Sequence, residues 1–283
     1  MDSSAPLGFI PATEDMILGG VGKMIPKSPT LERLATFLGS YSGTDKLFMV
    51  IETTLKILVP LLNWRARFRH SAGLRKTPNS PVADRFSKMA GLISDSRMLW
   101  RLFGLVPIIK WLSAMERTPP SNRRLLTIER LQALAMLVYY PLEHLYYFGS
   151  HEVYKVPVKK LSTLAVWSCR AWAVYVVLHF LHLREDFKLL QEKETELARN
   201  AVAEKKVEAG DLVPADHAAT RAEYKTLQRK RRALKLDLFV NLVNLPQCLH
   251  WSLEKGYFQN KHLVDLFGWL AGIASFTSGW EAT

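Results

Sequence analysis

Two pairs of side chains in this 283-residue chain could carry acid–base or metal chemistry: Glu143 with His144, and His179 with His182. Glu143 and His144 are adjacent, so on a helix they point about 100° apart and do not face each other. Buried structural hydrogen bonding explains them better than a catalytic pair. His179 and His182 share a helical face, but no third ligand lies nearby. With no HExxH motif and no Gly-rich phosphate loop, the sequence predicts no enzyme activity, cofactor or metal site.

An apolar run from Leu161 to Leu183 must position these residues, and it contains no Gly, Pro, Asp, Glu or Lys. About 20 apolar residues in a helix are enough to cross a bilayer. Arg170, near the middle of the run, costs about 2.5–3.5 kcal/mol at mid-depth, whereas the Leu, Val and Phe side chains favour insertion by roughly 3–6 kcal/mol at most. The free energy of insertion is therefore only slightly favourable, unless Arg170 faces another helix. The alternative is a buried helix of a soluble all-α protein.

The composition favours a protein that divides its surface between lipid and water. Hydrophobic residues make up 48%, the mean hydropathy is near zero, and the net charge is +12. A strongly basic chain attracts anionic surfaces, either membrane or nucleic acid. The basic loop expected at residues 63–82 lacks the interleaved aromatics of a base-reading module, apart from Trp64 and Phe68. We therefore expect a membrane surface as partner and no nucleic acid. Cys169 and Cys248 lie in apolar runs, which indicates a reduced compartment without disulfides.

The chain divides into a lead-in and one membrane domain. Residues 1–29 are rich in Pro and Gly and predict a flexible lead-in. Residues 30–283 form the domain, with helices from Thr30 and from Asp45 to about Pro60, and a charged helical insert at about 184–235. A second span is expected from Leu263 to Trp280. There, a small-residue face allows close helix packing, and its members are Gly268, Gly272, Ser275 and Gly279.

The segment from Ala83 to Phe103 predicts an amphipathic helix. Steps of about 100° per residue gather large apolar side chains on one arc; these are Phe86, Met89, Leu92, Ile93, Leu99, Trp100 and Phe103. The opposite side is polar and carries Ser87, Ser94, Arg97 and Arg101, flanked by Lys88 and Asp95. A basic rim with aromatics on the apolar face is typical of a helix lying in a membrane interface. A surface helix packed on a protein core is the alternative.

Several short motifs occur together in a fixed order. Gly43-Thr44-Asp45-Lys46-Leu47 comes first, then Ser96 to Leu102 on the amphipathic helix, then Tyr139-Tyr140-Pro141-Leu142-Glu143-His144, then Asn241-Leu242 through His250-Trp251, and finally the small-residue span. Over roughly residues 30–183 and 236–280 the chain resembles the peroxisomal biogenesis factor 11 family, most closely its gamma-like (C-type) branch. The tyrosine–proline–glutamate–histidine motif carries most of this resemblance.

The resemblance implies an all-α peroxisomal membrane protein that elongates the membrane before fission. It further implies that the amphipathic helix inserts in one leaflet, that copies self-associate with each other and with related members, and that a dynamin-type GTPase and its tail-anchored adaptor are partners. The membrane-remodelling residues would then be Phe86, Lys88, Met89, Leu92, Ile93, Arg97, Trp100 and Arg101. A pore for small metabolites is the alternative function, with Arg170 and Asp265 as intramembrane charges beside a polar path.

Topology follows from charge. With spans at 161–183 and 263–280, both termini lie on one side of the membrane. Residues 1–160 hold 22 Lys and Arg against 12 Asp and Glu, a net charge of +10, which places that side in the cytosol. A soluble helical scaffold is the remaining alternative.

Overall fold

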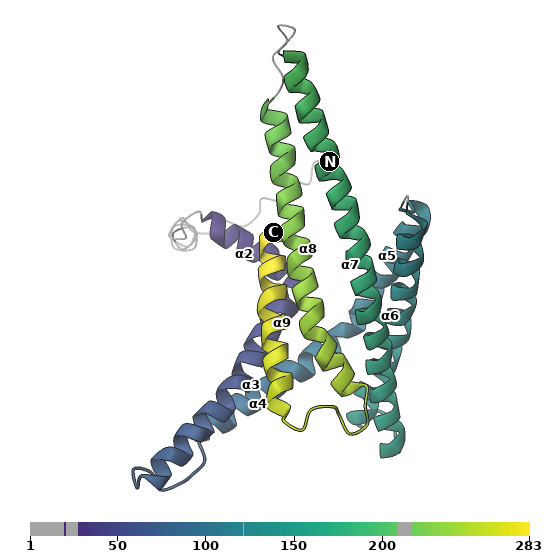
Figure 1. Ribbon diagram of the computed structural model, residues 1–283. Helices are drawn as coiled ribbons and strands as arrows, with labels where there is room; N and C mark the ends of the chain where they lie inside the picture. The colour runs from purple at the N-terminus through teal and green to yellow at the C-terminus, as the bar shows by residue number, and fades with distance from the viewer. Residues whose placement is uncertain (1–19, 21–27, 121, 209–216) are drawn as a thin grey trace, which may run out of the picture.

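The computed structural model describes residues 20, 28–120, 122–208 and 217–283, and the ordered elements in these ranges are all helical, with no strand among them (Figure 1). The elements are α2 (Pro29–Gly39), α3 (Tyr41–Ser71), α4 (Pro81–Trp100), the 3-10 turn η1 (Arg101–Gly104), α5 (Leu105–Arg117), α6 (Arg123–Ser150), α7 (Val158–Glu208), α8 (His217–Trp251) and α9 (Lys261–Ala282). The predicted all-α fold is confirmed for this part of the chain. The lead-in predicted at residues 1–29 lies almost wholly outside it.

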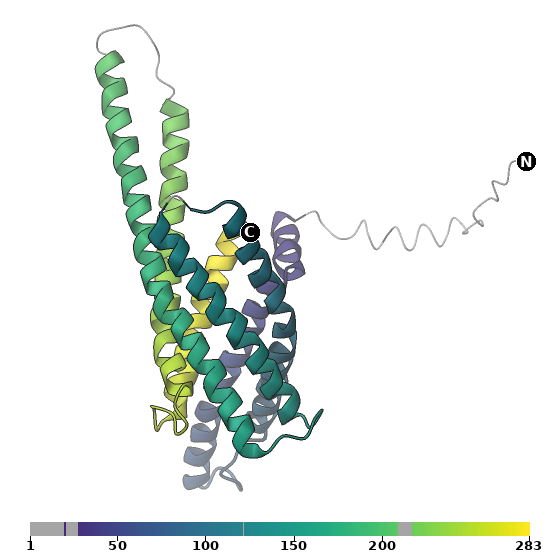
Figure 2. The same cartoon turned by 90° about the vertical axis from the view of Figure 1, so that its right-hand side faces the viewer.

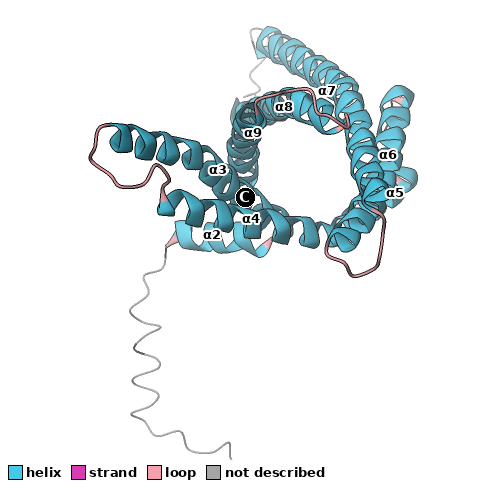
Figure 3. Cartoon of the chain, turned by 90° about the horizontal axis from the view of Figure 1, so that it is seen from below, coloured by secondary structure: helices cyan, strands magenta, loops and turns pink. Residues whose placement is uncertain are grey.

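The helices from α3 onward form a closed ring, seen end-on in Figure 3. Going round it, α3 packs on α4, the α4–η1–α5 segment meets α6, α6 packs on α7, α7 on α8, α8 on α9, and α9 returns to α3. The α4–η1–α5 segment continues in one direction, and each of the other ring helices runs opposite to the one before it (Figure 1). The last helix therefore closes the ring against the first.

The ring has its polar side chains inside and much of its apolar surface outside. The buried polar and charged residues include Glu52, Arg97, Gln132, Glu143, His144, Asn241 and Gln247. The exposed apolar residues come from every helix of the ring, and include Leu61, Trp64, Leu92, Phe103, Ile109, Leu134, Val138, Trp167, Val177, Leu242 and Leu266. An exterior of this kind would be costly in water but suits a bilayer, where lipid replaces water as the surrounding solvent.

Three helical segments of the described chain are long and apolar enough to cross a membrane: α3, the segment Pro81–Arg117, and α7 over Val158–Asn200. The third includes the apolar run predicted as a span. The second predicted span, Leu263–Trp280 in α9, is not among them, because Asp265 and the small and hydroxylated residues of α9 lower its hydropathy. The two N-terminal segments were not predicted as spans, since basic residues and Pro107 interrupt their apolar pattern.

Helix α3 differs from its predicted bounds at both ends. It begins one residue after Ser40, whose hydroxyl caps it by accepting from the Gly43 N–H at 3.0 Å. It then continues through Pro60 to Ser71, so residues 63–71 of the predicted basic loop are helix. Proline lacks the backbone N–H of a regular helix, yet membrane helices tolerate it where neighbouring groups satisfy the freed carbonyl. The basic residues therefore stand on the end of a long helix.

Helices α7 and α8 continue beyond the ring as a long hairpin, which we call the arm (residues 184–208 and 217–235; Figures 1 and 2). The two helices meet along residues spaced seven apart, as in a coiled coil: Val176, Leu183 and Leu190 on α7, and Leu227, Leu234, Asn241 and Cys248 on α8, all of them buried. Asn241 donates to the Val176 carbonyl at 2.9 Å and fixes the register. The arm and the ring thus share one continuous seam.

The two ends of the described chain meet at the side of the ring that carries the arm. The Phe37 ring of α2 packs edge-on against Phe276 at 5.2 Å and Trp280 at 5.7 Å. The Arg33 guanidinium donates to the Trp280 carbonyl and lies over its indole ring. Helix α2 and the end of α9 therefore lie side by side; that both termini share one side of the membrane stays a prediction.

The leucine seam of the arm generates a testable prediction. Leu190→Ala removes a side chain that is 2% exposed, and we expect it to destabilise the hairpin by about 2–5 kcal/mol because it leaves a cavity. Hydrogen exchange of the arm amides should rise accordingly. Thr195→Ala, an exposed position of the same helix, is the matched control and should leave exchange unchanged. Equal exchange in both variants would mean that the two helices of the arm do not pack as described.

Candidate functional site

Arg97 is the central charged group of the ring interior. It lies on α4 with 7% exposure and reaches across to two carboxylates of α3. Its Nε donates to Asp45 Oδ1 at 2.8 Å and its Nη1 to Glu52 Oε2 at 2.6 Å. Lys56, one turn further along α3, donates to the other Glu52 oxygen at 2.6 Å. Four charges therefore neutralise one another where α3 meets α4.

Arg101, one turn after Arg97, connects the same segment to α6. Its Nη1 donates to Glu143 Oε1 at 2.6 Å and to the Tyr139 hydroxyl at 3.2 Å. The Tyr139 hydroxyl in turn donates to the same Glu143 oxygen at 2.5 Å. The predicted motif residues of α6 thus bind the second arginine of the amphipathic helix. His144 is held separately, with its Nδ1 2.6 Å from the Tyr140 carbonyl, which supports the structural interpretation of Glu143 and His144 over a catalytic pair.

The 3-10 turn η1 is the corner at which the chain changes its packing partner. Before it, α4 lies on α3; after it, α5 lies on α6. A Cβ at Gly104 would lie 2.6 Å from the Tyr140 ring, so only glycine lets η1 come this close to α6. Further along the same boundary, Asp95 accepts from the Tyr147 hydroxyl at 3.3 Å and lies 2.8 Å from His151 Nε2. The boundary between α4–η1 and α6 is therefore held largely by polar contacts.

A cavity of about 550 Å³ occupies the middle of the ring. Every helix of the ring except α5 contributes to its wall, with Glu52 and Lys56 from α3, Arg97 from α4, Arg101 from η1, Tyr139 and Glu143 from α6, Cys169 and Trp172 from α7, Gln247 and Trp251 from α8, and Asp265 and Gly268 from α9. A second pocket, of about 200 Å³, adjoins it and shares Trp172 and Asn244. This second pocket is lined by Lys46, His179 and Asp237 and lies toward the arm.

A polar cluster joins α6 to α7 near the arm. The buried Gln132 amide bridges the two histidines predicted to share a face, with its nitrogen 3.2 Å from His179 Nδ1 and its oxygen 2.7 Å from His182 Nδ1. The second His182 nitrogen lies 3.4 Å from Asp186 and 3.8 Å from Glu129. Burial raises the pKa of the Glu129 carboxyl. No group of three or more ligating side chains in the described ranges could hold a metal ion.

The apolar arc of the predicted amphipathic helix faces outward. Met89, Leu92, Leu99 and Phe103 are exposed, while Phe86 and Trp100 are partly covered and Ile93 is buried. Lys88 lies in the open, but Arg97 and Arg101 do not form an exposed basic rim as predicted, because carboxylates of α3 and α6 hold them inside the ring. The predicted arcs match the observed faces only in part, since Ile93 of the apolar arc is buried beside Arg97 and Ser87 of the polar side is exposed.

Arg170 and the glycines of α9 lie apart from the cavity charges, except Gly268. The Arg170 side chain is exposed, donates to the Ser252 carbonyl at 3.2 Å, and covers the Trp167 ring at 4.9 Å. Arg170 is therefore not part of the cavity wall, whereas Asp265 is. A Cβ at Gly268 would come within 3.3 Å of Thr53, and Gly272 and Gly279 also meet the N-terminal helices closely. The structure thus places the small-residue face of α9 against α3 and α2.

Sequence reasoning missed the residues that hold the arginines and part of the cavity wall. Asp45 and Glu52 lie 52 and 45 positions before Arg97, too far apart for any helical spacing to relate them. The one available signal was the charge of Asp45, Glu52 and Lys56 within an otherwise apolar helix. In a membrane segment, isolated charges of this kind generally face the protein interior.

The sequence of this chain is similar to those of known proteins. A family model described as Peroxisomal biogenesis factor 11 (PEX11) matches residues 31–280. An uncharacterised protein of Schizosaccharomyces pombe is 24% identical over 135 residues, which cover 48% of this chain and 50% of the relative. The chain thus spans about half the length of the curated relative it matches. No solved structure matches.

The buried ion pairs of Arg97 generate a second prediction. Arg97→Ala removes the positive charge that pairs with Asp45 and Glu52. We expect the free energy of unfolding to fall by about 3–5 kcal/mol. The measurement is thermal unfolding of the purified protein in detergent. Arg85→Ala, an exposed arginine of the same helix, should change stability by less than about 0.5 kcal/mol. If Arg97 bound lipid headgroups instead, its loss would leave the melting temperature unchanged and weaken binding to anionic vesicles.

Proposed function

The chain belongs to the peroxisomal biogenesis factor 11 family, which gives it a role in peroxisome biogenesis and proliferation at the peroxisomal membrane, and we propose that it bends and elongates this membrane by a wedge built from α3 and α4. The gamma-like branch remains our assignment from the motifs. The observation that carries the proposal is the shape of the α3–α4 pair, which leaves the ring sideways and ends in a basic, aromatic tip (Figures 1 and 3).

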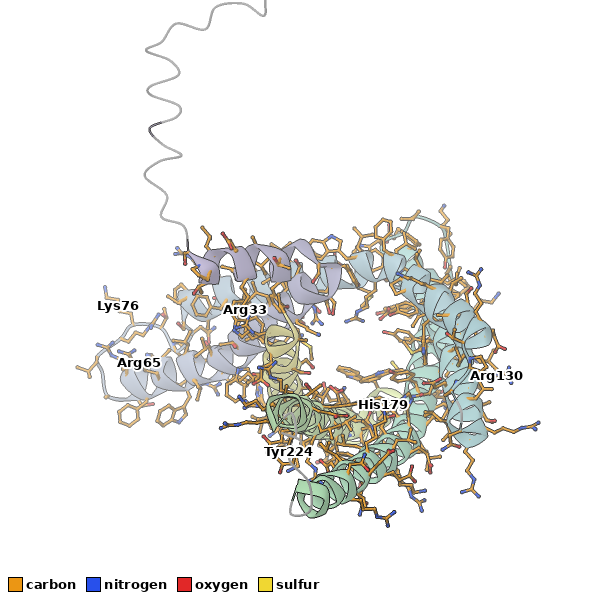
Figure 4. All side chains as sticks on the ribbon, turned by 90° about the horizontal axis from the view of Figure 1, so that it is seen from above. Arg33, Arg65, Lys76, Arg130, His179 and Tyr224 are labelled. Atoms are coloured by element: carbon orange, nitrogen blue, oxygen red, sulfur yellow. The ribbon has the colours of Figure 1, made fainter. Side chains whose placement is uncertain are left out.

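The tip has the chemistry of a membrane interface. Trp64 and Phe68 are exposed and stack at 6.2 Å. Basic side chains surround them, and Figure 4 shows Arg65 and Lys76 pointing away from the ring. Aromatic rings settle at the headgroup level, and cationic side chains are attracted to anionic lipids at about 1 kcal/mol each. We infer that the tip anchors the pair at one surface of the bilayer.

The wedge would arise because the α3–α4 pair diverges from the ring toward the end opposite the arm and so widens the protein at that end (Figure 1). The ion pairs of Arg97 hold α4 on α3, so their exposed apolar side chains, including Leu92 and Leu61, displace lipid beside the ring. Lipid displaced unequally between depths favours a curved bilayer. This differs from a single helix lying flat in one leaflet, since the polar face of α4 is already occupied by α3.

Assembly would add these local bends together. We propose that copies associate with themselves and with related members, and that the elongated membrane is then divided by a dynamin-type GTPase recruited through its tail-anchored adaptor. We further propose that the arm and both ends of the chain face the cytosol, where such partners are found. The dense charge of the arm, at residues 184–208 and 217–235, supports its place in water.

The wedge generates a third prediction. Leu92→Asp places a charge on the lipid-facing side of α4, which costs about 2.5–3.5 kcal/mol in the bilayer interior. We expect the variant to fold but to lose the ability to draw vesicles containing anionic lipid into tubules, as observed by electron microscopy. Ser87→Asp adds the same charge to an exposed polar position of α4 and should still form tubules. Normal tubules from Leu92→Asp would remove α4 from the mechanism.

The central cavity favours a second candidate function, a channel for small metabolites. The cavity lies in the middle of the ring, adjoins a second pocket toward the arm, and has ionisable side chains in its wall. Charged groups inside membrane proteins commonly mark the path of a solute. The tip of the α3–α4 pair, with Trp64 and Phe68, is not part of the cavity wall, so one protein can carry out both activities.

A fourth prediction separates the two functions. Vesicles that contain the protein should release a trapped solute of glucose size. Ala165→Trp places a large indole in the cavity wall and should slow this release strongly, while tubule formation stays normal. Ala198→Trp, an exposed position of the arm, is the control and should release solute like the unmodified protein. Equal release from both variants would exclude the cavity as the path.

A further inference from the structure

We propose that the central cavity prefers small soluble organic anions, and that Lys56 and Arg101 set this preference. This inference rests on the second candidate function, the channel. It concerns the class of solute, which the presence of a path alone does not determine.

The charges in the cavity wall differ in how far they are accessible. The Lys56 side chain is 36% exposed, while its partner Glu52 is 5% exposed. The Arg101 side chain is 29% exposed, while its partner Glu143 is 8% exposed. In each pair the cation faces open space and the carboxylate is covered. A solute in the cavity therefore meets two cationic groups in front of their counterions.

The other charges of the wall do not reverse this balance. Arg97 is 9% exposed and its donors are occupied by two carboxylates. Asp265 is the acidic side chain of this wall with comparable exposure, 26%, and lies 3.9 Å from the His262 imidazole. In the adjoining pocket, Lys46 and Asp237 contribute one charge of each sign. The cavity wall thus carries two accessible cationic side chains and one accessible carboxylate.

The remaining wall favours an organic rather than an inorganic anion. A volume of about 550 Å³ lies within the roughly 300–1,000 Å³ of sites that hold small molecules. Aromatic side chains cover much of the wall, namely Tyr139, Tyr140, Tyr146, Trp172 and Trp251. Lysine and arginine bind carboxylates by charge-assisted hydrogen bonds, while aromatic walls accept an apolar body. A small carboxylate matches both properties.

The same cationic groups could attract the headgroup of an anionic lipid, and the two sources make different predictions. A soluble anion enters and leaves the cavity from water, so it carries current. A bound headgroup would neutralise Lys56 and Arg101 and abolish any preference among soluble ions. The cavity shares Trp172 and Asn244 with the pocket toward the arm, and this proximity to the charged arm favours entry from water.

The experiment measures ion selectivity of the full-length protein in planar bilayers of phosphatidylcholine. A gradient of potassium chloride, then of potassium succinate, gives the permeability ratio of anion to potassium from the reversal potential. We expect a ratio above one for both salts. Lys56→Gln should lower the ratio several-fold, and Lys56→Glu by roughly tenfold, because the charge near the path is reversed. Glu52 keeps its pair with Arg97 in both variants, so the ring should remain closed.

Two matched variants serve as controls. Arg65→Gln removes the same charge from the same helix outside the cavity and should leave the ratio unchanged; Figure 4 shows Arg65 pointing away from the ring. Lys56→Arg keeps the charge and should keep the preference. Far-ultraviolet circular dichroism of each variant in detergent checks that the helices have formed.

Each outcome decides between the alternatives. Absence of current from the unmodified protein overturns both the channel and its selectivity. Current with a preference for potassium, or a ratio that Lys56→Glu leaves unchanged, overturns the selectivity while the channel stands. Chloride current without succinate current overturns the organic class. Loss of the preference when phosphatidylserine is added would identify the occupant as a lipid headgroup and overturn the soluble class.

Discussion

The ion pairs between Arg97 and the two carboxylates of α3 constrain the whole ring. A guanidinium surrounded by apolar helices is tolerated only where partners compensate its lost hydration, and Asp45 and Glu52 supply that compensation. This contact fixes how α4 lies on α3. One turn later the chain reaches Arg101, which must find its own carboxylate on α6. The pairing of Arg97 with α3 and of Arg101 with α6 therefore sets the direction of the α4–η1–α5 segment.

The ring and its two extensions perform separate tasks because their surfaces differ. The ring encloses charge and exposes apolar side chains, so it is matched to a bilayer. The α3–α4 tip combines aromatics with basic groups, which suits the boundary of the bilayer. The arm covers its leucines and exposes charge, which suits water. A seam with one spacing joins arm to ring, and Asn241 keeps both in the same register.

The sequence was sufficient to predict the all-α fold and the apolar run of α7. It could not predict the position of Arg97, because periodicity separates polar from apolar faces without identifying which one meets lipid. Leu183 and Leu190 are seven residues apart in the sequence, but the many charged residues around them made this coiled-coil spacing hard to recognise. The length of α3 was underestimated at Pro60, since proline ends helices in water more often than in membranes.

The position of α9 has a consequence for how the protein is made. This helix fills the gap between α3 and α8, and it follows both of them in the chain. Contacts between α3 and α9 join residues more than 200 positions apart, such as Trp269 and Thr54. Contacts of such wide separation form late in folding. The ring therefore stays open toward one side during synthesis, and a chain that stops short of α9 would expose its charged interior to lipid.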